Sequence, residues 1–336
     1  MTTETASPQR PLPTPRPRLR DLAVLCRLPA VFTAIADPIA GAAVGMGSAW
    51  NIRAIHRFDL LFMVVPLACL SAGSLYLFGM VQNDVVDADA DAAVGKRRPI
   101  PEGRVGIADA RSFGLMLLAT GLLLALLIAA ITGGYQTVLL ASMLAGAICL
   151  YNRVLKETVI GPVAMGACRG LNMMLGFAAV ADLVPDIDIW TIERPAIRLL
   201  FAAFAAYVAG LTLFARDETG RPRRLGLLLG LLLALTSLIV MALSISGNHV
   251  KGLSLGGLLP AGLTLGTVAI TIAIRGTSAI VSREPAQIGG TIGWMILMII
   301  PIDAAIVLSC GGGVGVASLV MLLLVPAIAL KPIAMT

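Results

Sequence analysis

Long apolar runs follow one another along most of the chain and are separated by short polar segments. There are ten such runs, at residues 29–50, 60–82, 112–131, 135–152, 158–181, 196–214, 225–246, 253–274, 287–309 and 312–330. Each run is close to the roughly 20 residues with which a helix crosses a hydrocarbon core of about 30 Å. Because a helix satisfies its own backbone hydrogen bonds in lipid, the pattern predicts an all-α integral membrane protein, a bundle of nine to ten transmembrane helices. The count is nine if the last two runs, joined only by Cys310–Gly313, form one re-entrant hairpin.

The composition is that of a protein whose main solvent is lipid. Hydrophobic residues make up 58% of the chain, charged residues make up 13%, and the mean hydropathy is +0.92, which is far from a soluble globular domain. No soluble domain is inserted, so we expect a single transmembrane domain over residues 29–331. Residues 1–28 are rich in Pro and Arg and carry too little apolar surface to fold, which predicts a disordered cytoplasmic tail.

Basic residues are concentrated on one side of the predicted topology. If the N-terminal tail lies in the cytoplasm, the loops 96–111 and 216–224 lie there as well, in agreement with the positive-inside rule. We therefore expect a multi-pass protein of the bacterial inner (plasma) membrane, with its N-terminus and both charged loops in the cytoplasm. Topology and contact with anionic membrane lipids then explain the net charge of +6, and nucleic acid is not an expected partner.

The densest acidic cluster lies at the end of the second run, where Asn83 and Asp84 are followed by Asp87, Asp89 and Asp91. In a continuous helix, Asp84, Asp87 and Asp91 share one face with Asn83 beside them, and Asp89 points elsewhere. Three like charges on one face repel one another unless a cation neutralises them. Oxygen ligands without His or Cys favour Mg²⁺, so we interpret the cluster as a magnesium site at the membrane edge. The alternative is a solvated helix end.

A basic loop follows directly, with Lys96, Arg97 and Arg98 before Pro99 and Pro101. The prolines restrict the backbone, so the loop can hold its cations over the acidic cluster. Carboxylates, a metal ion and Arg or Lys side chains together are typical of sites that bind a diphosphate. The alternative is that the loop only sets the topology.

A second charged loop follows the sixth run and contains Arg216, Asp217, Glu218 and Arg221. It lies on the same predicted side of the membrane as the first, so the two loops can converge on one cavity. The alternative is an ordinary connecting loop that carries a helix N-cap.

Several polar residues interrupt or end the apolar runs. They are Asp37, Tyr151, Lys156, Arg169, Asn172 and Asp303. An arginine inside a span normally faces a polar cavity or an acid, which makes Arg169 the most informative of them. For Asp37 and Asp303 the same question arises, and the alternative for Asp37 is that Asp37-Pro38 serves a helix break.

These motifs resemble those of the UbiA superfamily of intramembrane prenyltransferases. The NDxxDxxxD motif of that family is matched by Asn83, Asp84, Asp87 and Asp91, and its RPxPxG loop by residues 98–103. The resemblance extends from Arg27 to about Asp217. It implies a bundle of about nine helices around a lipid-open central cavity with cytoplasmic capping loops.

The resemblance also implies roles for individual residues. The implied metal ligands are Asn83, Asp84, Asp87, Asp91, Asp217 and Glu218. The implied catalytic residues are Asp84, Asp87, Asp91, Asp217, Lys96 and Arg98, and the implied substrate-binding residues are Asn83, Arg97, Tyr151, Lys156, Arg169, Asn172, Arg216 and Arg221. The second motif departs from the usual DxxxD, because Arg221 stands four residues after Asp217. A second Mg²⁺ is therefore expected to bind weakly or to be replaced by the guanidinium of Arg216 or Arg221.

The expected activity is Mg²⁺-dependent transfer of a prenyl group from an isoprenoid diphosphate to a lipophilic acceptor, with release of pyrophosphate. An aromatic, a quinone precursor, a porphyrin and a polar lipid are all open as acceptors. Within the implied mechanism, Asp37, Arg169 and Asn172 are the candidates for orienting the acceptor, the second substrate. One alternative is a membrane terpene cyclase of the same fold, which would need no acceptor. The other is a non-enzymatic transporter or scaffold. The acidic motif has no second copy in the other half of the chain and lies at the membrane edge, which disfavours a transporter.

Overall fold

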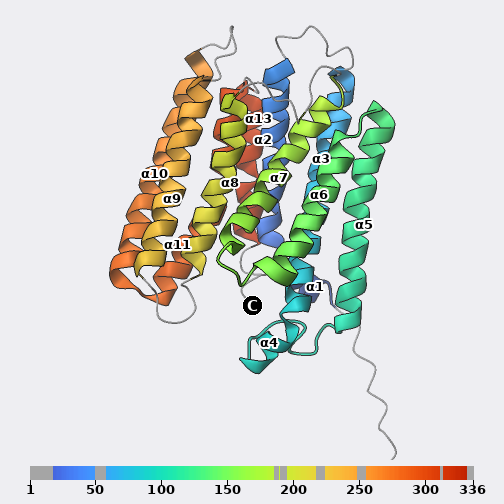
Figure 1. Cartoon of the computed structure of the whole chain (residues 1–336), viewed down its shortest axis with the longest axis vertical. Coiled ribbons are helices and arrows are strands. Elements are labelled where there is room, and N and C mark those ends of the chain that lie inside the picture. Colours follow the sequence, from blue (N-terminus) through green and yellow to red (C-terminus); the bar gives the residue numbers. More distant parts are fainter. Residues whose placement is uncertain are drawn as a thin grey trace, which may run out of the picture.

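The computed structural model describes residues 18–49, 58–184, 189, 195–216, 224–247, 255–310 and 313–330, and every regular element in these ranges is helical (Figure 1). The elements are α1 (Leu19–Leu25), η1 (Leu28–Ala30), α2 (Val31–Ala49), α3 (Phe58–Val86), α4 (Ala88–Ala93), α5 (Ile107–Thr132), α6 (Gln136–Leu150), η2 (Tyr151–Leu155), α7 (Gly161–Ala181), α8 (Pro195–Ala215), α9 (Arg224–Gly247), α10 (Leu255–Ser282), α11 (Pro285–Leu297), α12 (Ile299–Ser309), α13 (Gly313–Leu322) and α14 (Leu324–Ala329). The long helices stand side by side, and α4 lies at the lower end of the view in Figure 1. This end of the bundle is called the α4 end below.

Nine helical segments of the described chain are long and apolar enough to cross a membrane. This confirms the prediction of an all-helical, multi-pass integral membrane protein. The ninth segment, Pro285–Ser309, consists of α11 and α12 in succession. The last apolar run forms α13 and α14, which together make a shorter apolar segment, Gly313–Ala329. Of the two predicted counts, nine and ten transmembrane helices, the described part of the chain therefore agrees with nine.

Helices α2 and α7 form the centre of the bundle. Helix α2 packs against α3, α7 and α12, and α7 packs against α6 and α8 as well. Most of α7 is buried on all sides. The outer helices α5 and α10 instead expose large apolar side chains such as Leu123 and Ile270, as expected for surfaces that face lipid.

A proline inside α2 determines how α2 and α7 meet. Pro38 has no backbone N–H, so the carbonyl of Ala34, four residues earlier, loses its helical partner. The side-chain amide of Asn172 in α7 donates a hydrogen bond to that carbonyl over 2.8 Å. A side chain of α7 thus satisfies the backbone that the proline frees, which a helix break inside a membrane requires.

The predicted disordered tail, residues 1–28, includes residues 19–25 and 28, which are helical in the structure. Residues 1–17 lie outside the described residues, but α1 and η1 occupy the last part of the range 1–28. Leu25 and Cys26 are buried against Val81 and Val105, and Asp21 forms an ion pair with Arg104. These contacts join the start of the chain to α3 and to the loop after α4, which a count of local prolines and arginines does not reveal.

Candidate functional site

The acidic motif lies where α3 ends and α4 begins, at the α4 end of the bundle. Helix α3 stops at Val86, Asp87 stands at the junction, and α4 starts at Ala88. The amide of Asp87 donates to the carbonyl of Asn83 and that of Asp91 donates to the carbonyl of Asp87, so the helical pattern of hydrogen bonds continues across the junction. The three acids nevertheless have different cationic partners.

Arg98 joins the two buried acids of the motif. Its Nη1 donates to Oδ1 of Asp84 over 3.0 Å and to Oδ2 of Asp91 over 2.6 Å. Nζ of Lys96 approaches the other oxygen of Asp91 at 2.7 Å. Asp84 and Asp91 are only 4% and 3% exposed, so their charges depend on these partners rather than on water.

Asp87, the third acid of the motif, contacts a different cation. Its Oδ2 forms an ion pair with Nζ of Lys156 and accepts a hydrogen bond of 3.2 Å from Nδ2 of Asn83. Lys156 follows η2, a π-helical turn that ends the helix α6. Such turns widen a helix locally and often lie at functional sites. The turn brings Lys156 to the acidic motif from the fourth transmembrane segment.

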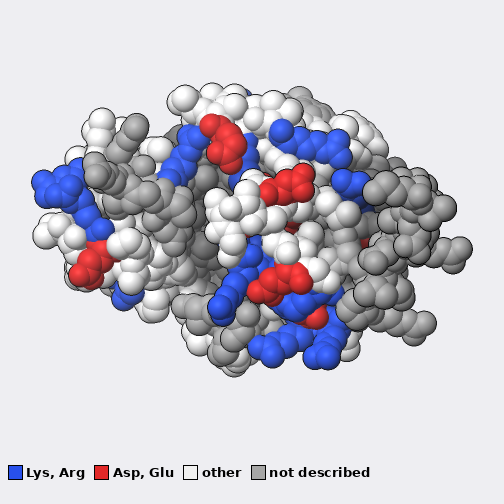
Figure 2. Space-filling model, turned by 90° about the horizontal axis from the view of Figure 1, so that it is seen from below, with Lys and Arg blue, Asp and Glu red and all other residues white. Residues whose placement is uncertain are grey.

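The loop between α4 and α5 is held by backbone hydrogen bonds. The amide of Lys96 donates to the carbonyl of Asp91, and that of Val105 donates to the carbonyl of Pro99. This confines Lys96 and Arg98 to the acidic motif, whereas Arg97 is exposed. Figure 2 shows the α4 end, where acidic and basic side chains lie close together near the middle of the face.

Sequence reasoning did not assign Arg27 to the site. It precedes η1, with its backbone in the left-handed region at a φ of 46°, and its Nη2 lies 3.7 Å from Oδ1 of Asp84. Four basic side chains thus approach three carboxylates at this end of the bundle, namely those of Arg27, Lys96, Arg98 and Lys156.

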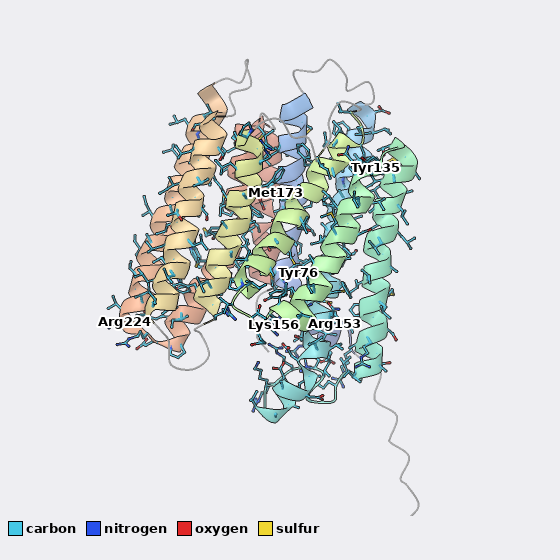
Figure 3. All side chains as sticks on the ribbon, in the orientation of Figure 1. Tyr76, Tyr135, Arg153, Lys156, Met173 and Arg224 are labelled. Carbon is cyan, nitrogen blue, oxygen red and sulfur yellow. The ribbon has the colours of Figure 1, made fainter. Side chains whose placement is uncertain are left out.

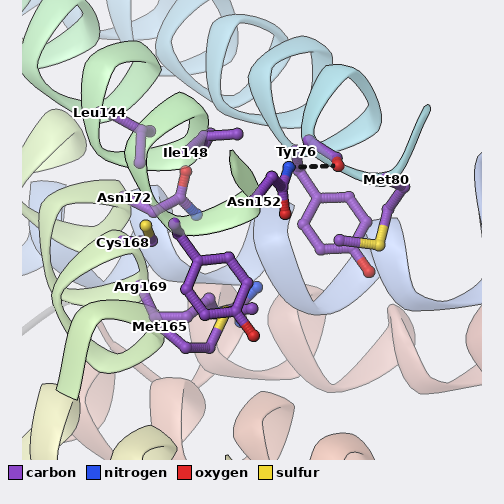
Figure 4. Close-up of a pocket in the computed structure, with 11 residues that line it drawn as sticks. Tyr76, Met80, Leu144, Ile148, Asn152, Met165, Cys168, Arg169 and Asn172 are labelled. Atoms are coloured by element: carbon purple, nitrogen blue, oxygen red, sulfur yellow. Dashed lines mark hydrogen bonds between the residues drawn. The ribbon is translucent and has the colours of Figure 1, made fainter. Parts of the chain in front are cut away.

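A pocket lies close to the acidic motif, between α3, α6, η2 and α7 (Figure 4). It is lined by Tyr76, Gly79, Met80, Leu144, Ile148, Tyr151, Asn152, Met165, Cys168, Arg169 and Asn172. Met80 is one helical turn before Asp84, which corresponds to about 5 Å along α3. The pocket therefore extends from the acidic motif into the bundle, where Figure 3 places Tyr76 well above Lys156.

The walls of the pocket are mostly apolar, and the polar groups among them are held in place. Nδ2 of Asn152 donates to the carbonyl of Gly79 over 2.9 Å and to Oε1 of Gln82 over 3.1 Å, and the first of these bonds is drawn in Figure 4. Tyr151, predicted to bind substrate, lines the same pocket. Tyr76 and Asn152 were not predicted, because only packing between α3 and α6 brings them together.

Arg169 and Asn172 line the pocket and also hold Asp37. Nη2 of Arg169 lies 2.8 Å from Oδ1 of Asp37, and Nδ2 of Asn172 lies 2.8 Å from Oδ2. Nη2 of Arg169 also donates to the carbonyl of Thr33. The structure thus brings together three residues that the sequence suggested for orienting a second substrate, and it shows that Asp37 reaches the pocket only through the other two.

The second charged loop falls largely outside the described residues, which include Arg216 but not Asp217, Glu218 or Arg221. Nη2 of Arg216 donates to the carbonyls of Glu157 and Thr158, over 3.2 and 2.7 Å. Arg216 therefore holds the segment that follows Lys156.

The donor atoms of the acidic motif are oxygens, which is the set that Mg²⁺ prefers. Within the described residues, however, no three His, Cys, Asp or Glu side chains are grouped closely enough to hold a metal ion. Arg98 and Lys156 stand between the carboxylates in this arrangement. The chemistry of the donors fits Mg²⁺, and binding it requires these cations to share or give up the carboxylates.

The sequence pattern of the UbiA prenyltransferase family matches residues 39–288, which is most of the chain. The chain belongs to the UbiA prenyltransferase family. The family match includes the acidic motif, the basic loop and every residue that lines the pocket.

Named relatives in the UbiA family differ in their acceptors. The digeranylgeranylglyceryl phosphate synthase of Ignicoccus hospitalis is 29% identical over 183 residues, covering 54% of this chain and 59% of the relative. The protoheme IX farnesyltransferase 2 of Cenarchaeum symbiosum is 30% identical over 196 residues, covering 56% and 58%. The matched region thus spans less than two thirds of the length of these relatives.

The fold is also that of solved UbiA structures. A UbiA homologue from Archaeoglobus fulgidus, bound to GPP and Mg²⁺, superimposes with a TM-score of 0.53 at 13% identity, over 83% of this chain and 99% of that one. At this identity the likeness concerns the arrangement of the helices.

Proposed function

We propose that this UbiA-family protein transfers a prenyl group from an isoprenoid diphosphate to a lipophilic acceptor in the membrane, in a Mg²⁺-dependent reaction that releases pyrophosphate. The observation that carries the proposal is the position of the acidic motif. Three carboxylates and four basic side chains form a cluster, and one of its acids, Asp84, follows a residue of the apolar pocket, Met80, by one helical turn. An isoprenoid diphosphate also consists of a charged group joined to an apolar chain, so the charged cluster can hold its diphosphate and the pocket its chain.

The first motif is the proposed Mg²⁺ site, with Asn83, Asp84, Asp87 and Asp91 as ligands, and Asp217 and Glu218 are proposed for a second, weaker one. Mg²⁺ would neutralise phosphate charge and so stabilise the departing pyrophosphate. Oxygen donors alone, together with the diphosphate-bound relative, support this choice of metal.

The basic residues of the motif have a proposed role on the diphosphate itself. If Mg²⁺ were bound by the carboxylates, Lys96, Arg98 and Lys156 would be free to donate to the phosphate oxygens of a diphosphate, with Arg27 beside them. These donors stabilise the negative charge that builds on the leaving group as the bond between C1 and oxygen breaks. We propose further substrate contacts for Arg97 at the rim, and for Arg216 and Arg221 from the second loop.

The pocket provides the site for the apolar chain and for the acceptor. Its apolar walls exclude water, which would otherwise capture the allylic cation. An electron-rich atom of the acceptor forms the new bond to C1, and its proton passes to a carboxylate or to the released pyrophosphate. Tyr151, Arg169 and Asn172 are the proposed polar contacts of the acceptor. An aromatic, a quinone precursor, a porphyrin or a polar lipid fits this description.

We also propose that the α4 end faces the cytoplasm of a bacterial inner membrane. The basic residues of the loop after α4 support this orientation through the positive-inside rule. The apolar outer faces of α5 and α10 would then contact membrane lipids.

The decisive experiment measures pyrophosphate release by the detergent-purified protein from geranyl, farnesyl and geranylgeranyl diphosphates, with Mg²⁺ and with EDTA, in each case with a mixture of acceptors from the four proposed classes. Asp87→Ala should abolish release, because Asp87 is in the motif. Asp89→Ala is the matched control, because Asp89 is exposed and two residues away, and it should retain release. Equal activity of the two variants, or release that survives EDTA, would contradict the proposal.

Product analysis separates the transferase from a terpene cyclase. A transferase releases pyrophosphate efficiently only when an acceptor is present and forms a prenylated acceptor. A cyclase forms a hydrocarbon or alcohol from the diphosphate alone, and that product would replace the proposed activity by the alternative of the same fold.

A further inference from the structure

Two helical segments that pack against each other behind the pocket each carry a buried aspartate close to a proline. In α2, Asp37 directly precedes Pro38. The ninth segment is interrupted at Met298 between α11 and α12, and Pro301 lies two residues before Asp303. Helix breaks inside a membrane expose backbone and acidic groups to one another, and such places recur as binding sites for small cations.

Asp303 is the residue that packing and hydrogen bonding do not explain. It is 0% exposed, and within the described residues neither of its carboxyl oxygens has a hydrogen-bond partner. Helix α12, which carries Asp303, packs against α2, which carries Asp37, and the two fully buried carboxyl groups interact with each other. Two ionised carboxylates accept hydrogen bonds but donate none. If Asp37 and Asp303 were both ionised, their carboxylates would therefore repel each other.

The charges around the pair do not balance if both acids are ionised. Arg169 of α7 is the cation that contacts Asp37, and Tyr76 of α3 faces the same cluster. Helices α11, α13 and α14 contain no charged residue, and Arg275 of α10 lies over the ring of Trp294. One guanidinium thus stands against two carboxyl groups, and an unpaired buried charge in a membrane costs several kcal/mol.

We propose that Asp37 and Asp303 bind one proton between them and form a proton-binding site behind the part of the pocket wall that Arg169 and Asn172 form. The shared proton turns the contact between two carboxylates into a hydrogen bond from Asp303 to Asp37. It also makes the cluster neutral, with one negative charge against Arg169. The proposal concerns the resting protein and does not depend on the prenyl-transfer activity.

The proton-binding site is coupled to the pocket through two hydrogen bonds. Arg169 and Asn172 hold the two oxygens of Asp37 and line the pocket with the rest of their side chains. Nε of Arg169 is buried without a partner within the described residues. Loss of the proton would place a second negative charge close to Arg169 and draw its guanidinium away from the pocket, so Asp303 is proposed as a positioning residue for Arg169.

Infrared spectroscopy of the purified full chain tests the site directly. At pH 7 a protonated carboxyl group gives a carbonyl band that an ionised one lacks, and this band shifts when H₂O is replaced by D₂O. Spectra of two variants are subtracted to isolate the band of one residue. The wild-type minus Asp303→Asn spectrum should contain one such band. The matched control is Asp109→Asn, because Asp109 is exposed, and its difference spectrum should contain none.

The variants are chosen so that folding does not obscure the result. The amide of Asp303→Asn can donate to Asp37 as the protonated acid does, so this variant is expected to fold. Asp303→Glu keeps a carboxyl group and should shift the band without removing it. Absence of the band from the wild-type minus Asp303→Asn spectrum would overturn the proposal.

Sodium is the competing occupant and has its own arm of the experiment. Thermal unfolding is compared in NaCl and in choline chloride at equal ionic strength. A proton site predicts equal midpoints in the two salts. A midpoint raised by sodium in the wild type but not in Asp303→Asn, with no protonated-carboxyl band, would assign the site to sodium instead.

Discussion

Arg97 and Arg98 are neighbours in the sequence, but only Arg98 holds the acidic motif. Arg98 bridges Asp84 and Asp91, whereas Arg97 is exposed. The sequence predicted that the basic loop covers the acids, because the two motifs are adjacent along the chain. The resemblance gave Arg98 a catalytic role and Arg97 a substrate-binding one, but the contacts of each side chain depend on how the loop turns back on α4 and could not be predicted.

Arg98→Ala should therefore lower the rate of pyrophosphate release by about 10²–10³-fold, the loss typical of one removed donor to a developing charge. Arg97→Ala is the matched control and should change the rate by less than about tenfold. The rates are compared at saturating diphosphate, with circular dichroism to verify helicity. A larger effect of Arg97→Ala would mean that the loop rearranges when substrate binds.

Cys26 reports on the contact between the chain start and the acidic motif. Burial, and secondarily the negative charge of Asp84, raise the pKa of this thiol to about 12. At pH 8 only about one thiol in ten thousand is then ionised, and the thiolate is the reactive form.

A variant that retains Cys26 as its only cysteine should therefore react very slowly with iodoacetamide at pH 8. The rate should rise about tenfold per pH unit without a plateau below pH 10. The control is a variant in which all five native cysteines are replaced and Arg97→Cys supplies the only thiol, and this exposed thiol should react readily. Fast labelling of Cys26 in the folded protein would show that α1 detaches from the bundle.

At the scale of elements, the contact between α2 and α7 is the tightest constraint on the site. Gly176 lies against the carbonyl of Pro38, and a methyl group there would overlap that backbone atom. Asn172, one turn away on the same helix, holds both Asp37 and the carbonyl that Pro38 frees. The pocket wall formed by α7 therefore depends on backbone contact with α2.

Gly176→Ala should destabilise the protein by about 1–3 kcal/mol or more, because overpacking against backbone cannot be relieved by a side-chain rotation. Gly146→Ala is the matched control, since nothing lies within 4 Å of the added methyl on α6. Unfolding midpoints in one detergent are compared. Equal midpoints would mean that α2 and α7 separate at little cost.

The elements themselves were largely predictable, and their interruptions were not. Long apolar runs must be helical in lipid, so the spans could be found from hydropathy alone. The break at Asp87 could not be found in this way, because alternating Ala and Asp residues give no stop signal. There Asp87 pairs with Lys156, whereas Asp84 and Asp91 pair with Arg98, and these two cations lie on separate elements.

At the scale of the whole molecule, the candidate site combines a local motif with distant partners. Residues 83–98 lie close together in sequence, so their association could be predicted. Arg27, Tyr76 and Asn152 come from other parts of the chain, and only the packing of helices brings them to the pocket. Their positions required knowledge of which spans are neighbours, which hydropathy does not contain.

The proposed orientation of the bundle can be tested with one cysteine placed at each of its two ends. In a cysteine-free background, Arg97→Cys at the α4 end should react with a membrane-impermeant maleimide only when the cytoplasmic side is accessible. Tyr135→Cys is the matched control, because Tyr135 is exposed at the opposite end (Figure 3), and it should show the reverse. The reverse result for both would place the acidic motif outside the cell.

The ion pair between Asp37 and Arg169 also has a consequence for synthesis. The two residues are 132 positions apart, so the ribosome completes Arg169 roughly 7 to 26 s after Asp37, at about 5–20 residues per second. During that interval the first span carries an acid without its partner, which costs about 2.5–3.5 kcal/mol at the centre of an inserting helix. Stable insertion of the first span therefore depends on the arrival of the fifth, and the order of synthesis separates the two events.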